Sequence, residues 1–146
     1  MISFEIKNVD WPVLDLKKVD TWLQEVAAAH DRKIGNLNYL FCDDEEILNI
    51  NRQFLNHDYY TDIITFDYSH KQRVGGDLFI SLETVKSNSE EIGVDYDSEL
   101  LRVIAHGLLH LCGIKDKGPG EREKMEQEED KALVIWAELR KQSDEI

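Results

Sequence analysis

The sequence predicts an α+β fold in which about four strands and about five helices form one domain of residues 1–146. Segments with strand-like and helix-like patterns alternate along the 146 residues, and no low-complexity linker or internal repeat divides them. The region 71–75 connects two strand-like segments so briefly that they must pair as an antiparallel hairpin. The region 98–112 is apolar nearly all round, which is typical of a helix buried against a sheet.

The first half of the chain predicts two strands and two helices. Alternating apolar residues near the N-terminus indicate a strand, and a stretch with helical spacing of apolar residues follows. Asp43 with Glu46 three residues later is similar to a capping box, and the helix that it starts reaches about Phe54. The expected elements are a strand over 2–6, a helix over 14–29, a strand over 36–42 and a helix over 43–54.

The second half of the chain predicts a hairpin followed by three helices. Its first two segments are rich in β-branched and aromatic residues, and the later segments have helical spacing of apolar residues. The expected elements are strands over 61–68 and 76–82 and helices over 82–92, 98–112 and 120–141. The result is a mixed sheet of about four strands, whose strand order the pattern does not determine.

Charge and cysteine content restrict the class of protein. The net charge is −13, and nucleic-acid-binding proteins usually have a basic face instead. The region 101–117 is an exception, because Arg102, Lys115 and Lys117 outnumber Asp116 there. The two cysteines lie in apolar stretches without CxxC spacing, which indicates reduced thiols in a cytoplasmic protein. The N-terminal region predicts neither a secretory signal nor a membrane span.

Two histidines in the apolar helix are the strongest functional signal. His106 and His110 are four residues apart, so a helix places both imidazoles on one side. Gly113 follows where a helix often ends in a left-handed residue, and that turn can direct Asp116 back toward them. Three protein ligands would leave one position open for water, as in catalytic zinc sites. The helix would then lie against the sheet as in zincins, with one zinc per chain.

A structural role for these histidines is the alternative. Buried histidines are more often hydrogen-bonded core residues than metal ligands. Arg102 extends the pair into a polar stripe on an otherwise apolar helix. Burying such a stripe costs several kcal/mol unless its members have partners. The Gly113 and Asp116 continuation favours the metal-site interpretation.

Three motifs, in order, resemble the YbeY family of endoribonucleases. The segment 106–116 reads HGLLHLCGIKD and resembles the family's metal motif, H-G-x-L-H-L-x-G-Y-D-H. The segment 61–66, TDIITF, resembles the family's T-D-V-L-S-F, and 76–81, GDLFIS, resembles G-D-I-x-I-S. The resemblance implies a zinc-dependent hydrolase that cleaves single-stranded RNA in ribosomal RNA maturation and ribosome quality control. It implies the ribosome and ribosomal RNA as partners and gives no reason to expect DNA.

The chain departs from the family pattern at two positions. Asp116 stands where the family has its third histidine ligand, and a carboxylate oxygen is an ordinary zinc ligand. Leu55 stands where the family has an arginine thought to act on the phosphate. We therefore expect Arg102 as the candidate catalytic cation, and Arg52 and Lys117 as candidate substrate-binding cations.

Two other functions fit parts of this pattern. The spacing H-x3-H-x2-G-x2-D is similar to that of metallopeptidases, which carry a glutamate base directly after the first histidine. Gly107 occupies that position, cannot transfer a proton, and is expected to allow close approach of a substrate. A non-catalytic ribosome-binding module with an inert metal site is the other alternative, because Leu55 replaces the arginine and the surface is acidic.

Overall fold

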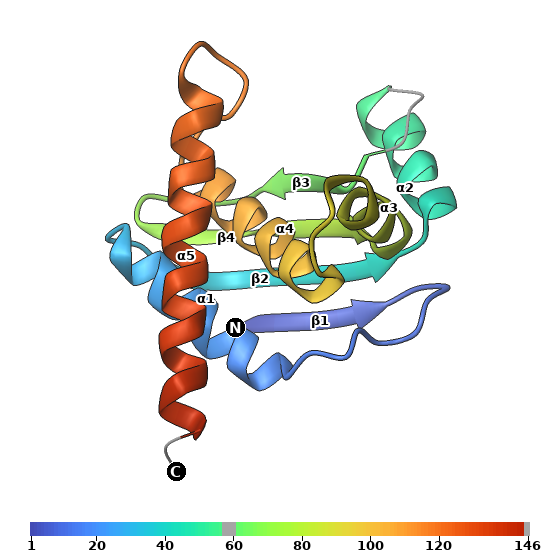
Figure 1. Cartoon of the computed structure of the whole chain (residues 1–146). Helices are drawn as coiled ribbons and strands as arrows, with labels where there is room; N and C mark the ends of the chain where they lie inside the picture. Colours follow the sequence, from blue (N-terminus) through green and yellow to red (C-terminus); the bar gives the residue numbers. More distant parts are fainter. Residues whose placement is uncertain (57–60, 145–146) are drawn as a thin grey trace.

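The computed structural model describes residues 1–56 and 61–144, and Figure 1 shows how their elements are arranged. The chain begins with β1 (Ile2–Ile6), α1 (Leu16–Ala29), β2 (Lys33–Cys42) and α2 (Asp44–Ile50), which continues as a π-helical turn (Asn51–Leu55). It goes on with β3 (Ile63–Asp67), β4 (Arg73–Ser81), α3 (Leu82–Ile92), α4 (Tyr96–Leu111) and α5 (Glu121–Asp144).

The four strands form one mixed sheet in the order β1-β2-β4-β3. The pairs β1·β2 and β2·β4 are parallel, whereas β3 and β4 form an antiparallel hairpin. Parallel neighbours need a crossover connection, and α1 supplies it between β1 and β2. The register of β2 against β4 shifts between Ile34 and Leu37.

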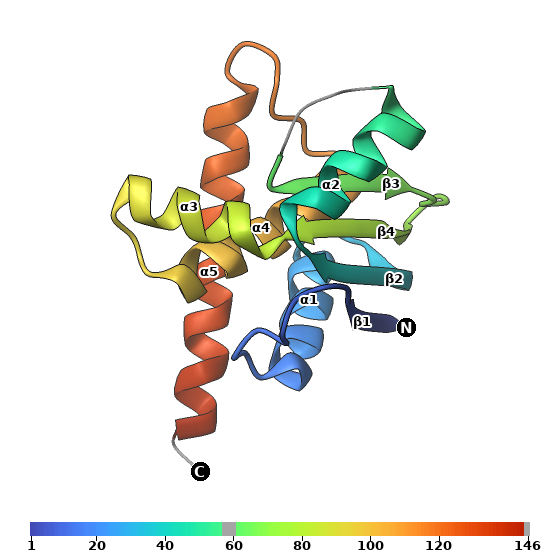
Figure 2. The ribbon, with the colours of Figure 1, turned by 90° about the vertical axis from the view of Figure 1, so that its right-hand side faces the viewer.

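Helices cover the two faces of the sheet unequally. On one face α1 and α4 pack against the strands, and α5 lies across α4 and α1 as an outer layer (Figure 1). The main core lies between these helices and the sheet, and includes Trp22, Tyr39, Leu78 and Ile104. On the other face, α2 covers only a small apolar cluster, formed by Cys42, Ile47, Ile50 and Ile64 (Figure 2). Much of that second face is open.

The predicted fold class is confirmed: the described chain holds a mixed four-stranded sheet and five α-helices. The boundaries differ by a few residues. The motif helix predicted over 98–112 is α4, Tyr96–Leu111, because Asp95 caps it with its side chain on the Ser98 N–H. The helix predicted over 43–54 ends as an α-helix at Ile50 and widens into the π-helical turn. Within the described residues, no helix is both long and apolar enough to cross a membrane.

Candidate metal centre

The C-terminal end of α4 closes in the way that the sequence predicts. Gly113 has a φ of +95°, in the left-handed region where a side chain is strained. Its N–H donates to the His110 carbonyl, and the Ile114 N–H donates to the Leu109 carbonyl, each at 3.0 Å. These two bonds make a Schellman turn. The turn reverses the chain and brings Asp116 back toward α4.

Gly107 has a structural role that corrects the sequence interpretation. It faces the sheet, not a substrate: a Cβ at this position would lie 2.3 Å from Leu78 Cδ2 and 2.9 Å from Ile63 Cδ1. Only glycine lets α4 approach β4 and β3 this closely. A glutamate at residue 107 would point into the apolar core, so the base of a metallopeptidase has no place here.

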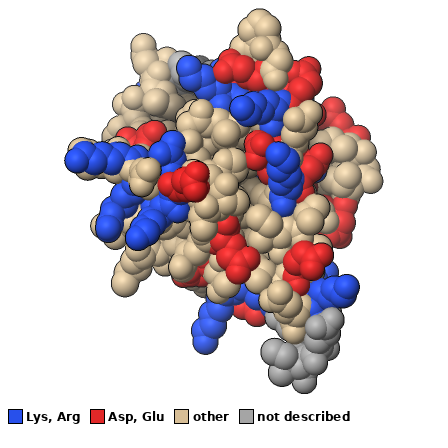
Figure 3. Space-filling view, turned by 90° about the vertical axis from the view of Figure 1, so that its left-hand side faces the viewer, with Lys and Arg blue, Asp and Glu red and all other residues tan. Residues whose placement is uncertain are grey.

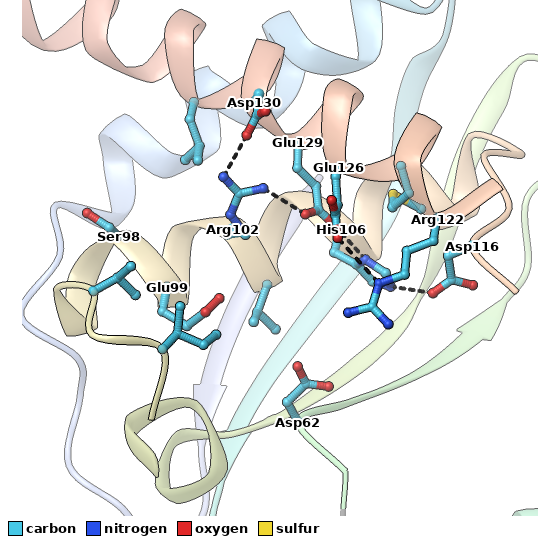
Figure 4. A pocket seen from close by; sticks show the side chains of 15 residues that line it. Asp62, Ser98, Glu99, Arg102, His106, Asp116, Arg122, Glu126, Glu129 and Asp130 are labelled. Atoms are coloured by element: carbon cyan, nitrogen blue, oxygen red, sulfur yellow. Dashed lines mark hydrogen bonds and ion pairs between the residues drawn. The ribbon is translucent and has the colours of Figure 1, made fainter. Parts of the chain in front are cut away.

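His106 lies between two carboxylates from different parts of the chain (Figure 4). Its Nδ1 is 2.7 Å from Glu129 Oε2, and its Nε2 is 3.3 Å from Asp116 Oδ2. Glu129 is buried on α5, whereas Asp116 is partly exposed in the loop after α4. One ring nitrogen is therefore held by a buried carboxylate, and the other faces the cavity beside a second carboxylate.

Arg102 lies one turn before His106 and binds the same glutamate. Its Nη1 donates to Glu129 Oε1 at 2.9 Å, and its Nη2 donates to Asp130 Oδ1 at 2.7 Å. The guanidinium charge is thus compensated by two carboxylates of α5. Arg102 remains a candidate functional residue, and this geometry favours a role in holding Glu129 over direct contact with a phosphate.

Aromatic packing places α5 so that Glu129 can reach α4. The Trp22 indole N–H donates to the Ala132 carbonyl at 2.7 Å, in the buried interface between α1 and α5. One turn further along, Trp136 packs edge-on against Trp22 with ring centroids 5.4 Å apart. These contacts lie directly after Glu129 on α5, and they fix the position of Glu129 along α4.

The cavity at His106 has a volume of about 660 Å³ and is rich in carboxylates. Its described lining holds two arginines, Arg102 and Arg122, against six acidic side chains: Asp62, Glu99, Asp116, Glu126, Glu129 and Asp130. The positive surface expected over residues 101–117 is therefore wrong at this site, because α5 and the start of β3 add acidic groups that local sequence does not reveal. Such a cavity favours a cation over a bare phosphate.

The pKa of His106 also indicates that the cavity favours positive charge. Burial lowers the pKa of His106, but the Glu129 hydrogen bond and the charges of Glu129, Asp116 and Asp62 outweigh burial, so the net pKa is raised. Burial raises the pKa of the Asp62 carboxyl, and the nearby His106 partly offsets that effect. Asp62 thus faces the histidine across the cavity (Figure 4).

The remaining predicted site residues lie outside the cavity lining. His110 is exposed on the last turn of α4, and its imidazole has no hydrogen-bond partner among the described residues. Lys117 is exposed directly after Asp116, and Arg52 is exposed in the π-helical turn. In the described part of the chain, no three histidine, cysteine or acidic side chains already converge as a metal site.

Sequence reasoning missed Glu129, the closest partner of His106. A signal for it exists. Met125, Glu129 and Ala132 fall at helical spacing and are all buried, so an acidic residue stands on the apolar stripe of a charged helix. A buried carboxylate in such a position needs a partner, which His106 and Arg102 provide.

Comparison with known proteins identifies the family. The family model described as "Endoribonuclease YbeY" matches residues 3–137. The chain belongs to this family. The Endoribonuclease YbeY of Phocaeicola vulgatus is 56% identical over 135 residues, covering 92% of this chain and 98% of the relative. That of Flavobacterium psychrophilum is 40% identical over 136 residues, covering 93% of this chain and 96% of the relative.

A solved structure confirms the architecture. The solution structure of a Thermotoga maritima protein matches with a TM-score of 0.68 and 27% sequence identity, covering all of this chain and 96% of the other. The family assignment confirms the resemblance and the prediction of a hydrolase of the endoribonuclease class. Together with the buried position of Gly107, it leaves the metallopeptidase alternative without support.

Proposed function

We propose that this YbeY-family protein is a zinc-dependent, single-strand-specific endoribonuclease of the cytoplasm that acts in ribosomal RNA maturation and ribosome quality control. The family assignment supports RNA as the substrate. The observation that carries the metal site is the arrangement of His106, with Glu129 on one ring nitrogen and Asp116 beside the other. We propose one zinc per chain, with His106, His110 and Asp116 as ligands.

The spacing of the donor atoms fits zinc. Zinc bonds to imidazole nitrogen and carboxylate oxygen of about 2.0–2.2 Å put two tetrahedral ligand atoms roughly 3.3–3.5 Å apart. His106 Nε2 and Asp116 Oδ2 are 3.3 Å apart. His110 follows at i+4 on the same helix, and its imidazole would join them by a change of rotamer. The excess of carboxylates in the cavity supplies the negative field that a divalent cation needs.

The residues around the ligands have separate tasks. Glu129 would accept a hydrogen bond from the Nδ1–H of His106, which leaves Nε2 with its lone pair toward the cavity. Arg102 holds the other carboxylate oxygen of Glu129 and so keeps that acceptor in place. We propose that both are positioning residues. A bound zinc would supply a Lewis acid for a phosphoryl oxygen and would activate a water molecule.

Substrate contact has to come from other cations, because Arg102 is already paired. Lys117 follows the ligand Asp116 and is exposed, without an ion pair to any described residue. Arg52 lies in the same π-helical turn as Leu55, the position of the family arginine. We propose that Lys117 and Arg52 contact RNA phosphates. With few phosphates neutralised at this site alone, RNA binding there would be weak and would depend shallowly on salt.

An RNA cleavage assay tests the proposal. We expect purified protein to cleave an unstructured RNA strand, to lose this activity with a zinc chelator, and to regain it with added zinc. A duplex of the same sequence should resist cleavage. Zinc binding without cleavage by the wild-type protein would favour the alternative of an inert ribosome-binding module.

The identity of the third ligand has its own test. Asp116→His restores the family's usual residue and should keep zinc affinity within about tenfold, because both residue types bind zinc. Asp116→Ala should weaken zinc binding more than this. Equal zinc affinity of the alanine variant and the wild-type protein would show that another residue completes the site.

A further inference from the structure

We propose a second RNA-binding site at the edge of the open sheet face, where β2 and β4 begin. We call it the basic sheet end, and it consists of Lys33, Tyr68, His70, Lys71 and Arg73. This inference rests on the proposed function and deepens it: the cations would hold phosphates of the single strand, and Tyr68 would stack on a base. Exposed cations interleaved with aromatic rings are the usual means of binding single-stranded nucleic acid.

Backbone pairing brings the three cations together. Lys33 and Arg73 are direct partners in the parallel β2·β4 register, so their side chains leave the same face of the sheet. His70 and Arg73 are paired across the tight turn between β3 and β4, and each N–H donates to the other's carbonyl, at 2.9 and 3.0 Å. Lys71 lies within that turn. The N–H of Lys33 also donates to the carbonyl of Gln72, which ties β2 to the turn.

The three cations are available for a polyanion. Lys33, Lys71 and Arg73 are exposed, and none of them forms an ion pair with another described residue. Figure 3, seen from the side of the β3–β4 turn, shows basic side chains gathered along one edge of the molecule. A cluster of cations is unusual in this chain, because it has only 17 lysines and arginines against 30 acidic residues. This contrast favours a polyanionic ligand here.

A hollow of about 450 Å³ lies beside these cations. Arg73, Tyr68 and His70 line it together with Asn36 and Asn38. Tyr68 is 66% exposed, so much of its ring is accessible to a ligand. Asp77 is the acidic residue of the described lining, and the Asn38 amide donates to it at 2.9 Å. The hollow offers amide groups and an aromatic face for a base next to cations for its phosphate.

Two backbone features support a role for the cations beyond solubility. Lys71 has a φ of +58°, a conformation that asparagine and glycine adopt more easily than lysine. A lysine therefore stands where the turn itself would favour another residue. Gly35 faces Arg73, and a Cβ there would lie 2.8 Å from Arg73 Cγ, so the glycine leaves room for the arginine side chain.

The C-terminal end of α4, which carries His110, lies beside the basic sheet end. Arg32, next to Lys33, donates to the carbonyl of Cys112 at the end of α4, at 3.3 Å. Figure 1 shows the β3–β4 turn on the side where α4 ends. We propose that a strand held at His106 passes the end of α4 and continues onto the sheet edge. A long RNA would use both sites, whereas a dinucleotide would reach only the metal centre.

A charge-matched pair of triple variants tests this inference. The first, Lys33→Gln/Lys71→Asn/Arg73→Gln, removes the cations of the basic sheet end. The control, Lys17→Gln/Lys86→Gln/Lys141→Gln, removes three exposed lysines from α1, α3 and α5 and has the same net charge. The zinc-loaded proteins are compared by kcat/KM on a long unstructured RNA and on a dinucleotide, over a range of salt concentrations. Thermal melting checks that both variants fold.

We expect the first variant to lose on the order of a hundredfold in kcat/KM on the long RNA at 0.1 M salt, with the salt slope lower by roughly two, since each single-strand phosphate contact contributes about 0.7. Its cleavage of the dinucleotide should equal that of the wild-type protein. Equal activity of the first variant and the control on the long RNA would overturn the inference while leaving the proposed function intact. Absence of cleavage of either substrate by the wild-type protein would refute the proposed function, and the inference with it.

Discussion

The two helices of the proposed metal centre, α4 and α5, differ in how far their roles can be read from local sequence. α4 is apolar nearly all round, and its two histidines and the glycine turn stand within eight residues. α5 is mostly charged, and its single essential contribution, Glu129, is one of many glutamates along it. The comparison shows that the proposed ligand motif is local, while the carboxylate that holds its first histidine comes from a distant helix.

The largest expected effect is the loss of an imidazole from α4. His106→Ala should abolish zinc binding and reduce RNA cleavage to the level of zinc-free protein, because it removes the proposed ligand that lies between two carboxylates. Elemental analysis and an RNA cleavage assay measure both effects. His30→Ala is a matched control, since His30 Nε2 lies 3.2 Å from Glu128 of α5 but outside the cavity. Full zinc retention in His106→Ala would remove this residue from the site.

The next effect concerns α5. Glu129→Gln should weaken zinc binding by about tenfold to a hundredfold, the usual cost of losing the carboxylate that orients a ligating histidine. Asp130→Asn is the control, because Asp130 is the neighbouring exposed residue and, among the described residues, pairs with Arg102 and not with His106. Competition with a zinc-binding dye measures the affinities. Equal affinity in the two variants would show that α5 does not orient the centre.

The contrast between α4 and α5 also explains how much of the fold and of the site could be predicted from the sequence. The fold class, the hairpin, the end of α4 at its glycine turn and the approach of Asp116 to His106 all depend on short-range patterns. The pairing of His106 with Glu129 depends on how α5 crosses α4, which the Trp22 and Trp136 packing decides. The acidic character of the cavity depends on the same long-range packing, because its carboxylates come from the residue before β3, from α4 and the loop after it, and from α5.

The close contact of α4 with the sheet should make the protein sensitive to any side chain added at residue 107. Gly107→Ala should lower the free energy of unfolding by about 1–3 kcal/mol, because the new methyl group overlaps Leu78 and Ile63. Urea denaturation measures the change. Adding Leu78→Val should recover part of the loss by making room. An alanine variant as stable as the wild-type protein would mean that α4 does not need this close approach.

The smallest expected effect is that of Arg102→Ala, and this variant distinguishes a positioning role of Arg102 from direct contact with the phosphate. As a positioning residue, Arg102→Ala should weaken zinc binding by a few-fold up to tenfold, with kcat unchanged at saturating zinc. As a cation on the phosphate, it would leave zinc affinity unchanged and lower kcat by about tenfold to a thousandfold. Arg140→Ala is the control, since Arg140 is an exposed arginine of α5 that lies outside the cavity lining.

X-ray absorption spectroscopy of the zinc-loaded protein tests the central claim most directly, because it identifies the atoms bound to the metal. The account predicts one zinc per chain, bound by two imidazoles and by oxygen donors from Asp116 and water, all at about 2.0–2.2 Å. His110→Ala should abolish zinc binding, because it removes one of the two imidazole ligands. Sulfur scattering at about 2.3 Å from Cys112, or a zinc site without imidazole, would contradict it.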